Sequence, residues 1–194
     1  MLIVIRHPPT VWENIQKIQG RLDVQLADGW EQIIHDNIRM LKHAGRIFSS
    51  PLQRCKMVGK LISKRFEIPL IVKDILIEMD FGEFQGKTWK QISKEYPKEL
   101  YEKIMNNNNR LSNGLPIDGN IGYPKGETFS NLLNRTATLF ELINPDENTL
   151  CITHSQTIKA IIYNARKRRY NILPIYSKDL EGGIIIVSNV DCVY

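Results

Sequence analysis

Two histidines in this chain of 194 residues each follow directly after a short apolar run. Arg6 and His7 come after the run from Leu2 to Ile5, and His154 ends the run that starts at Leu150. A short continuous apolar run is typical of a buried strand, and ligands of open α/β sheets collect outside the carboxyl ends of strands. A neutral histidine can act as nucleophile, acid or base near pH 7, and an arginine offers donors suited to phosphate. Alone, such a pair more often serves a structural role.

Arg54 and Glu78 extend this set at the same predicted rim of the sheet. Arg54 lies one turn into the helix predicted after the strand that ends in Ser49-Ser50, and Glu78 follows the strand predicted over 70–76. Two His, two Arg and one Glu match phosphoryl transfer, which needs a nucleophile, fixed positive charge and an acid for the leaving group. The sequence has no DxDxDG, HExxH or GxxxxGK[ST] pattern. It therefore favours a histidine mechanism with neither a metal nor a cofactor.

The elements that must position these side chains alternate along the chain. Strands are predicted over 2–5, 47–50, 70–76, 150–153 and 184–187, the last after the Gly182-Gly183 break. Apolar residues at helical spacing predict helices over 29–41, 52–62, 88–96, 129–143 and 155–165. Thr88 and Gln91 form a capping box for the third helix, and Ser155 is placed to cap the last. Strands and helices interleaved in this way predict an α/β fold with a largely parallel sheet, in one domain over 1–194.

Two segments break the alternation. The loop that follows His7 begins with two prolines, which forbid an immediate helix, and it is long for a connector. Residues at about 104–126 are rich in Asn, Gly and Pro and are expected to form an irregular, lid-like excursion. Substrate determinants are expected in both segments.

Composition and charge narrow the classes of protein. No apolar segment approaches the roughly 18 residues of a membrane span, and no secretory pattern is visible, so a cytoplasmic protein without a membrane partner is expected. The net charge of +5 suits an anionic partner. Because aromatic residues do not interleave with the basic run at 165–170, a phosphorylated small molecule is favoured over nucleic acid. Cys55, Cys151 and Cys192 lack CxxC spacing, which indicates reduced, mostly buried thiols and no zinc site.

Six segments in order along the chain carry a resemblance to a known family: IVIRHPPT, IQGRLDVQLADG, SSPLQRCKMVGKLI, LIEMDFGEFQGKTW, PKGETF and ITHSQTIKAI. They resemble the successive motifs of the histidine phosphatase superfamily, the phosphoglycerate mutase-like proteins. LIEMDFGEFQGKTW is most similar to the small phosphatase branch of α-ribazole phosphatase and the broad phosphomonoesterases. The resemblance implies a three-layer α/β sandwich, with helices on both faces of a largely parallel sheet, that hydrolyses a phosphomonoester of a small molecule without a metal.

The resemblance also assigns roles to single residues. It implies that His7 is the nucleophile and becomes transiently phosphorylated, and that Arg6 and Arg54 bind the phosphoryl oxygens. His154 would add a positive or hydrogen-bonding contact. Glu78 would act as general acid for the leaving group and then as base for water. The helix after His154 would aim backbone N–H groups at the same anion, and further contacts are expected from Trp12, Asn14, Gln19 and Ser155.

The chain departs from the family pattern next to its first histidine. Pro8 and Pro9 stand where Gly and Glu are common, and proline removes a backbone donor from the phosphate site. Glu13 stands where many members carry a phosphate-binding Asn. Either the loop shifts by one residue to present Asn14, or this contact is missing. His154 is followed by Ser155, where Gly is the commoner residue.

Three functions therefore stay open at the level of sequence. The first is a phosphatase that works through phosphohistidine on His7. The second is a mutase-type phosphotransferase with the same site, and the third is a catalytically weak binding or regulatory relative. The oligomeric state, monomer or homodimer, is left open. Six further polar residues are expected to be structural or solvated, namely His35, His43, Asp80, Glu83, Glu127 and Arg135.

Overall fold

The computed structural model describes residues 1–175 and 184–188 and is built around a six-stranded sheet in the order β3-β2-β4-β1-β6-β5. The pairs β1 with β4, β4 with β2 and β2 with β3 are parallel, whereas β6 runs antiparallel to both β1 and β5. The sheet is thus mixed, with a parallel half around β4. The strands are β1 (Leu2–Arg6), β2 (Arg46–Ser49), β3 (Leu70–Val72), β4 (Thr149–Thr153), β5 (Asn171–Ile175) and β6 (Ile184–Ser188).

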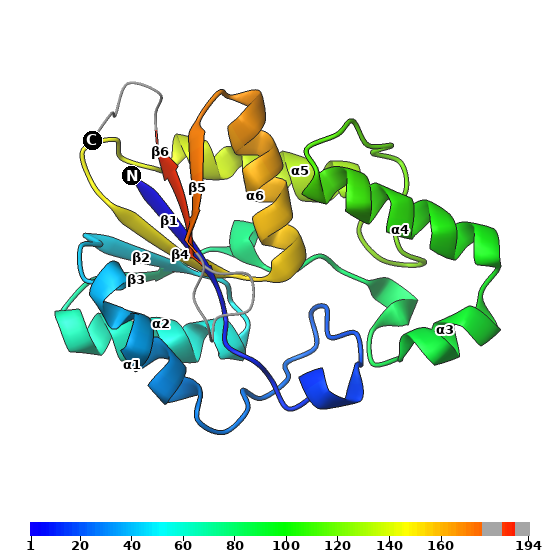
Figure 1. Ribbon diagram of the computed structural model, residues 1–194, viewed down its shortest axis with the longest axis horizontal. Helices are drawn as coiled ribbons and strands as arrows, with labels where there is room; N and C mark the ends of the chain where they lie inside the picture. The colour runs from blue at the N-terminus through cyan, green and yellow to red at the C-terminus, as the bar shows by residue number, and fades with distance from the viewer. Residues whose placement is uncertain (176–183, 189–194) are drawn as a thin grey trace.

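Helices cover both faces of this sheet, as the α/β prediction requires. Figure 1 shows α1 and α2 on one face and α5 and α6 on the other, with α3 and α4 extending to the side. No helix in the described part of the chain is both long and apolar enough to cross a membrane. The helices are α1 (Trp30–Leu41), α2 (Gln53–Phe66), α3 (Trp89–Glu95), α4 (Lys98–Ser112), α5 (Phe129–Ala137) and α6 (Ser155–Lys167), with short 3-10 turns η1 (Glu13–Ile15), η2 (Asp74–Leu76), η3 (Gly82–Phe84) and η4 (Thr138–Glu141).

The apolar run of β1 is explained by burial on both sides of the strand. Ile3 and Ile5 pack with α1 and α2, whereas Leu2 and Val4 pack with α6 and β6. Side chains of a strand alternate between faces, so when both faces are covered every position of the strand is buried and favours an apolar residue. The last residues of β1 and β4 then emerge together at the carboxyl edge of the sheet, where Arg6 lies opposite Thr153.

The buried thiols of Cys55 and Cys151 are free, as expected from the cysteine spacing. Burial raises the pKa of both thiols, which keeps them protonated. Cys192 and the Gly182-Gly183 break lie outside the described residues. The expected capping box is present, because Thr88 accepts the Gln91 N–H and the Gln91 side chain accepts the Thr88 N–H.

The predicted irregular excursion at 104–126 is half wrong. Helix α4 continues through Ser112, and only the part after it is irregular. Asparagine is a poor helix former in solvent, but Asn107 and Asn108 are buried here, and their amides donate to the Asp118 carbonyl and the Tyr123 hydroxyl. Tertiary hydrogen bonds thus override the local preference.

Other boundaries also differ from the predictions. The strand predicted over 70–76 ends at Val72 and becomes the turn η2, which buries Leu76. The helix predicted over 129–143 changes to η4 after Ala137. His154 is the N-cap of α6, and the predicted cap Ser155 is its first helical residue. Strand β5 was not predicted.

Candidate active site

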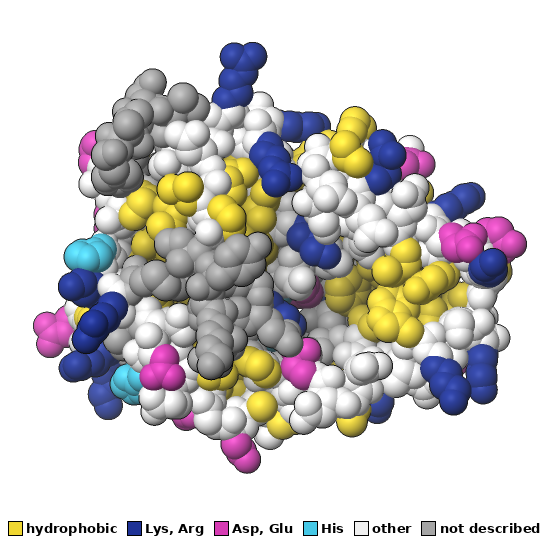
Figure 2. Space-filling view, in the orientation of Figure 1, with side chains coloured by type: hydrophobic (Ala, Val, Ile, Leu, Met, Phe, Trp, Pro, Cys, Tyr) yellow, Lys and Arg dark blue, Asp and Glu magenta, His cyan; other side chains and the backbone are white. Residues whose placement is uncertain are grey.

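A pocket of about 370 Å³ opens at the carboxyl edge of the parallel strands. This volume suits a small molecule. Its mouth lies on the face shown in Figure 2, where hydrophobic side chains gather beside it. The pocket is lined by Arg6, His7, Glu13, Lys17, Ile18, Gln19, Gly20, Arg54, Glu78, Phe81, Trp89, Met105, Asn108, Asn109, Tyr123, Ser155, Gln156 and Lys159.

His7 has one ring nitrogen fixed by the backbone and the other directed at an arginine. Its Nδ1 lies 2.7 Å from the Pro8 carbonyl oxygen, and since that oxygen can only accept, Nδ1 carries the proton. Nε2 is then unprotonated and accepts from the Arg54 Nε–H at 3.1 Å. Burial, reinforced by the charges of Arg54 and Arg6, holds the pKa of His7 well below its usual value of 6.5. Nε2 is therefore unprotonated at neutral pH, and its lone pair is held by the Arg54 N–H.

Arg54 is held rigidly between the two histidines. It lies in the first turn of α2 and is almost completely buried. Its terminal nitrogens donate to the carbonyls of Leu22 and Gly20, both at 2.7 Å, and its Nε–H is shared between His7 and His154 Nδ1 at 3.2 Å. A guanidinium that keeps its proton in all these contacts supplies a fixed positive charge next to the nucleophilic nitrogen.

His154 lies behind this pair and does not line the pocket. Its Nδ1 accepts from Arg54, so Nε2 carries the proton and donates to the Ser50 hydroxyl at 2.7 Å. Burial is the largest cause that holds the pKa of His154 well below 6.5, followed by the neighbouring His7 and Arg54. The imidazole is therefore a neutral hydrogen-bonding group at pH 7, and of the two contacts expected from it the positive one does not apply.

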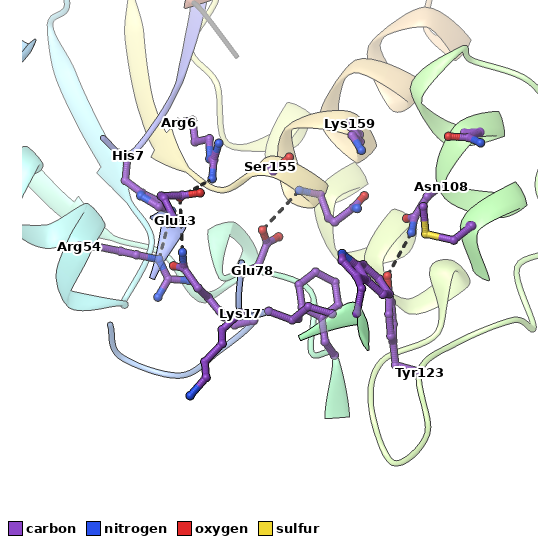
Figure 3. Close-up of a pocket in the computed structure, with 18 residues that line it drawn as sticks. Arg6, His7, Glu13, Lys17, Arg54, Glu78, Asn108, Tyr123, Ser155 and Lys159 are labelled. Atoms are coloured by element: carbon purple, nitrogen blue, oxygen red, sulfur yellow. Dashed lines mark hydrogen bonds and ion pairs between the residues drawn. The ribbon is translucent and has the colours of Figure 1, made fainter. Parts of the chain in front are cut away.

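Glu78 sits at the N-terminus of α6 with its two carboxylate oxygens in different surroundings. Oε1 accepts from the backbone N–H groups of Met79 at 2.9 Å and Thr157 at 3.2 Å. Among the described residues, Oε2 has one long contact, to the Gln156 N–H at 3.4 Å. Figure 3 shows the carboxylate at the centre of the pocket wall, across from His7 and Arg54. Oε2 is thus the oxygen available to hold or move a proton.

The first turn of α6 differs from the expectation drawn from the family. Its N–H groups at Gln156 and Thr157 are directed at Glu78 and not at an open anion site. Ser155 has the first-turn N–H that Glu78 does not engage, and its side chain lines the pocket as expected. The helix terminus therefore fixes the carboxylate and leaves one amide for a ligand.

Of the two arrangements that the sequence left open for Glu13 and Asn14, the structure has the one in which the loop does not shift. Glu13, not Asn14, lines the pocket, and its Oε1 forms an ion pair with Arg6 Nη2 at 2.9 Å. Asn14 is exposed and lies outside the lining, so its predicted phosphate contact is wrong in this conformation. The loop keeps its register because the turn η1 begins at Glu13 and the Gln19 amide also approaches Oε1, at 3.4 Å.

Gln19 and Trp12, the other two expected contacts, are placed differently. Gln19 lines the pocket, and its Nε2 donates to the Thr10 hydroxyl at 2.6 Å. Trp12 lies outside the lining and instead packs under Lys17, with 5.4 Å between Nζ and the ring centroid. Trp12 therefore contacts Lys17, which lines the pocket, and does not line the pocket itself.

Several pocket residues were missed by the sequence reasoning. Lys159 lies one turn after Ser155 on the same face of α6, and Figure 3 shows it pointing toward the pocket. Burial lowers its pKa, and no hydrogen bond or ion pair holds its Nζ within the described residues. The i, i+4 spacing from Ser155 could have signalled it. Nothing local could have signalled Asn108 and Tyr123, which reach the pocket from the predicted excursion.

The charges of the lining suit an anion. The lining includes four cationic side chains and two carboxyl groups, which leaves a formal excess of at least two positive charges when His7 is neutral. Within residues 1–175 and 184–188, no three His, Cys, Asp or Glu side chains come together so as to hold a metal ion. The site thus has preformed positive charge from arginine and lysine, which is the kind of field that stabilises a phosphoryl group in transfer.

A network of ion pairs is connected to the backbone of Glu78. Glu127 receives a two-pronged contact from Arg135, at 2.7 and 3.1 Å, and a third donor from Arg21 at 3.3 Å. Arg21 also donates to the backbone carbonyl of Glu78 at 3.1 Å. This agrees with the structural roles expected for Glu127 and Arg135, while His35 and His43 are exposed and lie outside the pocket lining.

Comparisons with known proteins agree with this geometry. The metal-independent phosphoserine phosphatase of Arabidopsis thaliana is 28% identical over 82% of this chain and 66% of its own length. The 2,3-bisphosphoglycerate-dependent phosphoglycerate mutase of Baumannia cicadellinicola is 28% identical over 83% and 79%. The structure of mycobacterial glucosyl-3-phosphoglycerate phosphatase has the same fold, with a TM-score of 0.72 and 21% identity over 86% and 79%. The model of the histidine phosphatase superfamily (branch 1) matches residues 2–177, and the chain belongs to this superfamily.

Proposed function

We propose that this protein is a metal-independent phosphomonoesterase that hydrolyses a phosphorylated small molecule through a phosphohistidine intermediate on His7. The observation that carries the proposal is the proton arrangement of His7. Nδ1–H is held by the Pro8 carbonyl at 2.7 Å, so Nε2 is unprotonated, and its lone pair accepts from Arg54 at 3.1 Å. Phosphatase relatives and a pocket of small-molecule size support the same reaction.

The first half of the reaction transfers the phosphoryl group to the enzyme. Nε2 of His7 attacks phosphorus while the bond from phosphorus to the leaving oxygen breaks, and a proton on Oε2 of Glu78 moves to that oxygen. As the phosphoryl group enters, the Nε2 lone pair passes from the Arg54 N–H to phosphorus, and the fixed Arg54 donates to a phosphoryl oxygen, with Arg6 as the second cation. The product alcohol leaves, and Glu78 remains as a carboxylate.

The second half regenerates the enzyme. Glu78 takes a proton from water, the water oxygen forms a bond to phosphorus, and the bond between phosphorus and Nε2 breaks. His154 does not reach the substrate in this scheme. It positions Arg54 through the Nδ1 contact, and its own orientation is set by Ser50. Gln19, Ser155 and Lys159 are the further side chains that the pocket offers to the phosphoryl group or the leaving group.

Hydrolysis of p-nitrophenyl phosphate in EDTA tests the proposal. Wild-type protein should turn over, and brief mixing with substrate followed by denaturation should trap acid-labile phosphate on His7. His7→Ala should abolish both signals and serves as the blank for a screen of phosphorylated metabolites. Absence of turnover and of trapped phosphate in the wild type would overturn the proposal and leave a binding or regulatory relative.

A mutase-type phosphotransferase is the second candidate, because one relative of similar coverage is a phosphoglycerate mutase. Both reactions begin with the same phosphohistidine. They differ in whether water or a second hydroxyl accepts the group, so the ratio of phosphate exchange to phosphate release from a phosphoglycerate separates them. Release that exceeds exchange supports the phosphatase.

A further inference from the structure

The proposed phosphoryl site contains a carboxylate of the protein itself, that of Glu13. Glu13 lines the pocket beside Arg6, His7 and Arg54, and its Oε1 binds Arg6 at 2.9 Å. Figure 3 shows this contact next to His7. A carboxylate that binds an arginine uses the same donors that a phosphoryl oxygen would use. Glu13 thus occupies part of the space and of the charge that the proposed reaction needs for its substrate.

The geometry points to Glu13 as a built-in competitor for the phosphoryl group, which weakens the retention of inorganic phosphate, the product of the proposed function on which this inference rests. With no ligand, the Glu13 carboxylate accepts from Arg6 Nη2. A substrate displaces the carboxylate with binding energy from both its phosphoryl group and its leaving group, whereas free phosphate has only the former. The cost of displacing Glu13 is the same for both, so the substrate keeps affinity from its leaving group while free phosphate is held weakly.

The turn that carries Glu13 is built so that it can move. None of the three residues of η1 is buried, and Ile15 within it and the nearby Val11 are each 49% exposed. Among the described residues, the backbone bonds that tie this segment to the rest of the protein lie near its ends, where the Val11 N–H donates to the Gln25 carbonyl and the Ile18 N–H to the Lys87 carbonyl. A segment with few buried apolar contacts opens at low cost in free energy. Glu13 can therefore leave Arg6 without disturbing the core.

The strength of the competition follows from charge. A carboxylate a few ångströms from a phosphate dianion repels it, and partial exposure to solvent reduces the effect. We expect Glu13→Gln, which keeps an oxygen for Arg6 but removes the charge, to lower the inhibition constant of inorganic phosphate by roughly tenfold. The KM for p-nitrophenyl phosphate should fall by a similar factor, because the ester presents the same phosphoryl group to Arg6.

The experiment measures binding of inorganic phosphate by calorimetry and its inhibition of turnover, in wild type, Glu13→Gln and Glu13→Ala. Glu31→Gln is the matched control, because Glu31 is exposed on α1, away from the pocket, and the substitution makes the same change in charge. Thermal melting verifies that each variant is folded. Competition predicts tighter phosphate binding in both Glu13 variants and no change in the control.

Two outcomes count against this inference in different ways. Unchanged or weaker phosphate binding in the Glu13 variants, with turnover intact in the wild type, overturns the competitor role and shows that Glu13 only positions Arg6. A wild type that neither binds phosphate nor turns over substrate overturns the proposed function as well. The two failures are therefore distinguishable.

Discussion

The two buried histidines should make the folded state sensitive to acid, and His7 should account for half of the effect. Both imidazoles are neutral in the folded protein, since burial and nearby cations hold the pKa of His7 and of His154 well below 6.5. In the unfolded chain each regains a pKa near 6.5. The unfolded state then binds protons that the folded state does not, so the free energy of unfolding falls as the pH drops below about 6.5.

The size of the effect follows from this difference in bound protons. At pH 5.5 each histidine should cost about 1.4 kcal/mol relative to pH 8, or about 2.8 kcal/mol for the two together. The loss ends where the pH reaches the lowered pKa of the folded state. Carboxylates also contribute to acid sensitivity, so the informative quantity is the difference between wild type and a variant without one of the imidazoles.

His7→Gln provides that difference. Urea unfolding followed by circular dichroism at pH 5.5 and pH 8 gives the free energy of unfolding for both proteins. Between pH 8 and pH 5.5 the free energy of unfolding should fall by about 1.4 kcal/mol less in the variant than in the wild type, because the variant no longer has that buried imidazole. Parallel pH curves for the two proteins would refute the reasoning, since they would mean that His7 is protonated equally in both states.

Three further predictions concern the groups around His7. Glu78→Gln should slow esters with poor leaving groups much more than p-nitrophenyl phosphate, which needs no acid; equal losses would contradict the acid role. Gly20→Ala should destabilise the fold by about 1 kcal/mol and reduce kcat/KM roughly tenfold, because Gly20 has a φ of +55° and an added Cβ would lie 2.1 Å from Gln85 Oε1. Adding Gln85→Ser to this variant should restore part of the activity. Normal kinetics in Gly20→Ala alone would argue against a strained loop. Lys159→Met should raise KM roughly tenfold with little change in kcat if Lys159 only binds anions, and steady-state kinetics with p-nitrophenyl phosphate decide this.

The strands that carry the site were predictable because their burial is extreme. β1 and β4 have helices on both faces, and that forces continuous apolar runs that end at Arg6 and His154. β5 was missed for the opposite reason. It is an outer strand paired only with β6, it contains Pro174, and Leu173 is 57% exposed. Such a strand forms through its partner and has little pattern of its own.

The site was predictable where residues follow strand ends and unpredictable where tertiary bonds decide. His7, Arg54 and Glu78 meet because the carboxyl ends of neighbouring parallel strands lie at one edge. Whether Glu13 or Asn14 faces the pocket depends on the rotation of a single turn, which bonds to Arg6 and Gln19 select. The sequence of that turn alone allows both orientations.

The proline after His7 connects the unusual sequence of this loop to the chemistry of the site. Pro8 removes the N–H that a glycine would offer to a phosphate, but its carbonyl accepts the His7 Nδ1 proton at 2.7 Å. The ring fixes φ of Pro8 and the following Pro9 restricts its ψ, so that carbonyl has few orientations available, and the tautomer with an unprotonated Nε2 is favoured before substrate arrives. The next carbonyl, of Pro9, accepts from the Ala27 N–H at 2.9 Å and ties the start of the loop to its end. The two prolines therefore remove one backbone contact with the anion and help to hold the nucleophilic imidazole in place. The positive charge that binds the anion then has to come from Arg6, Arg54 and Lys159.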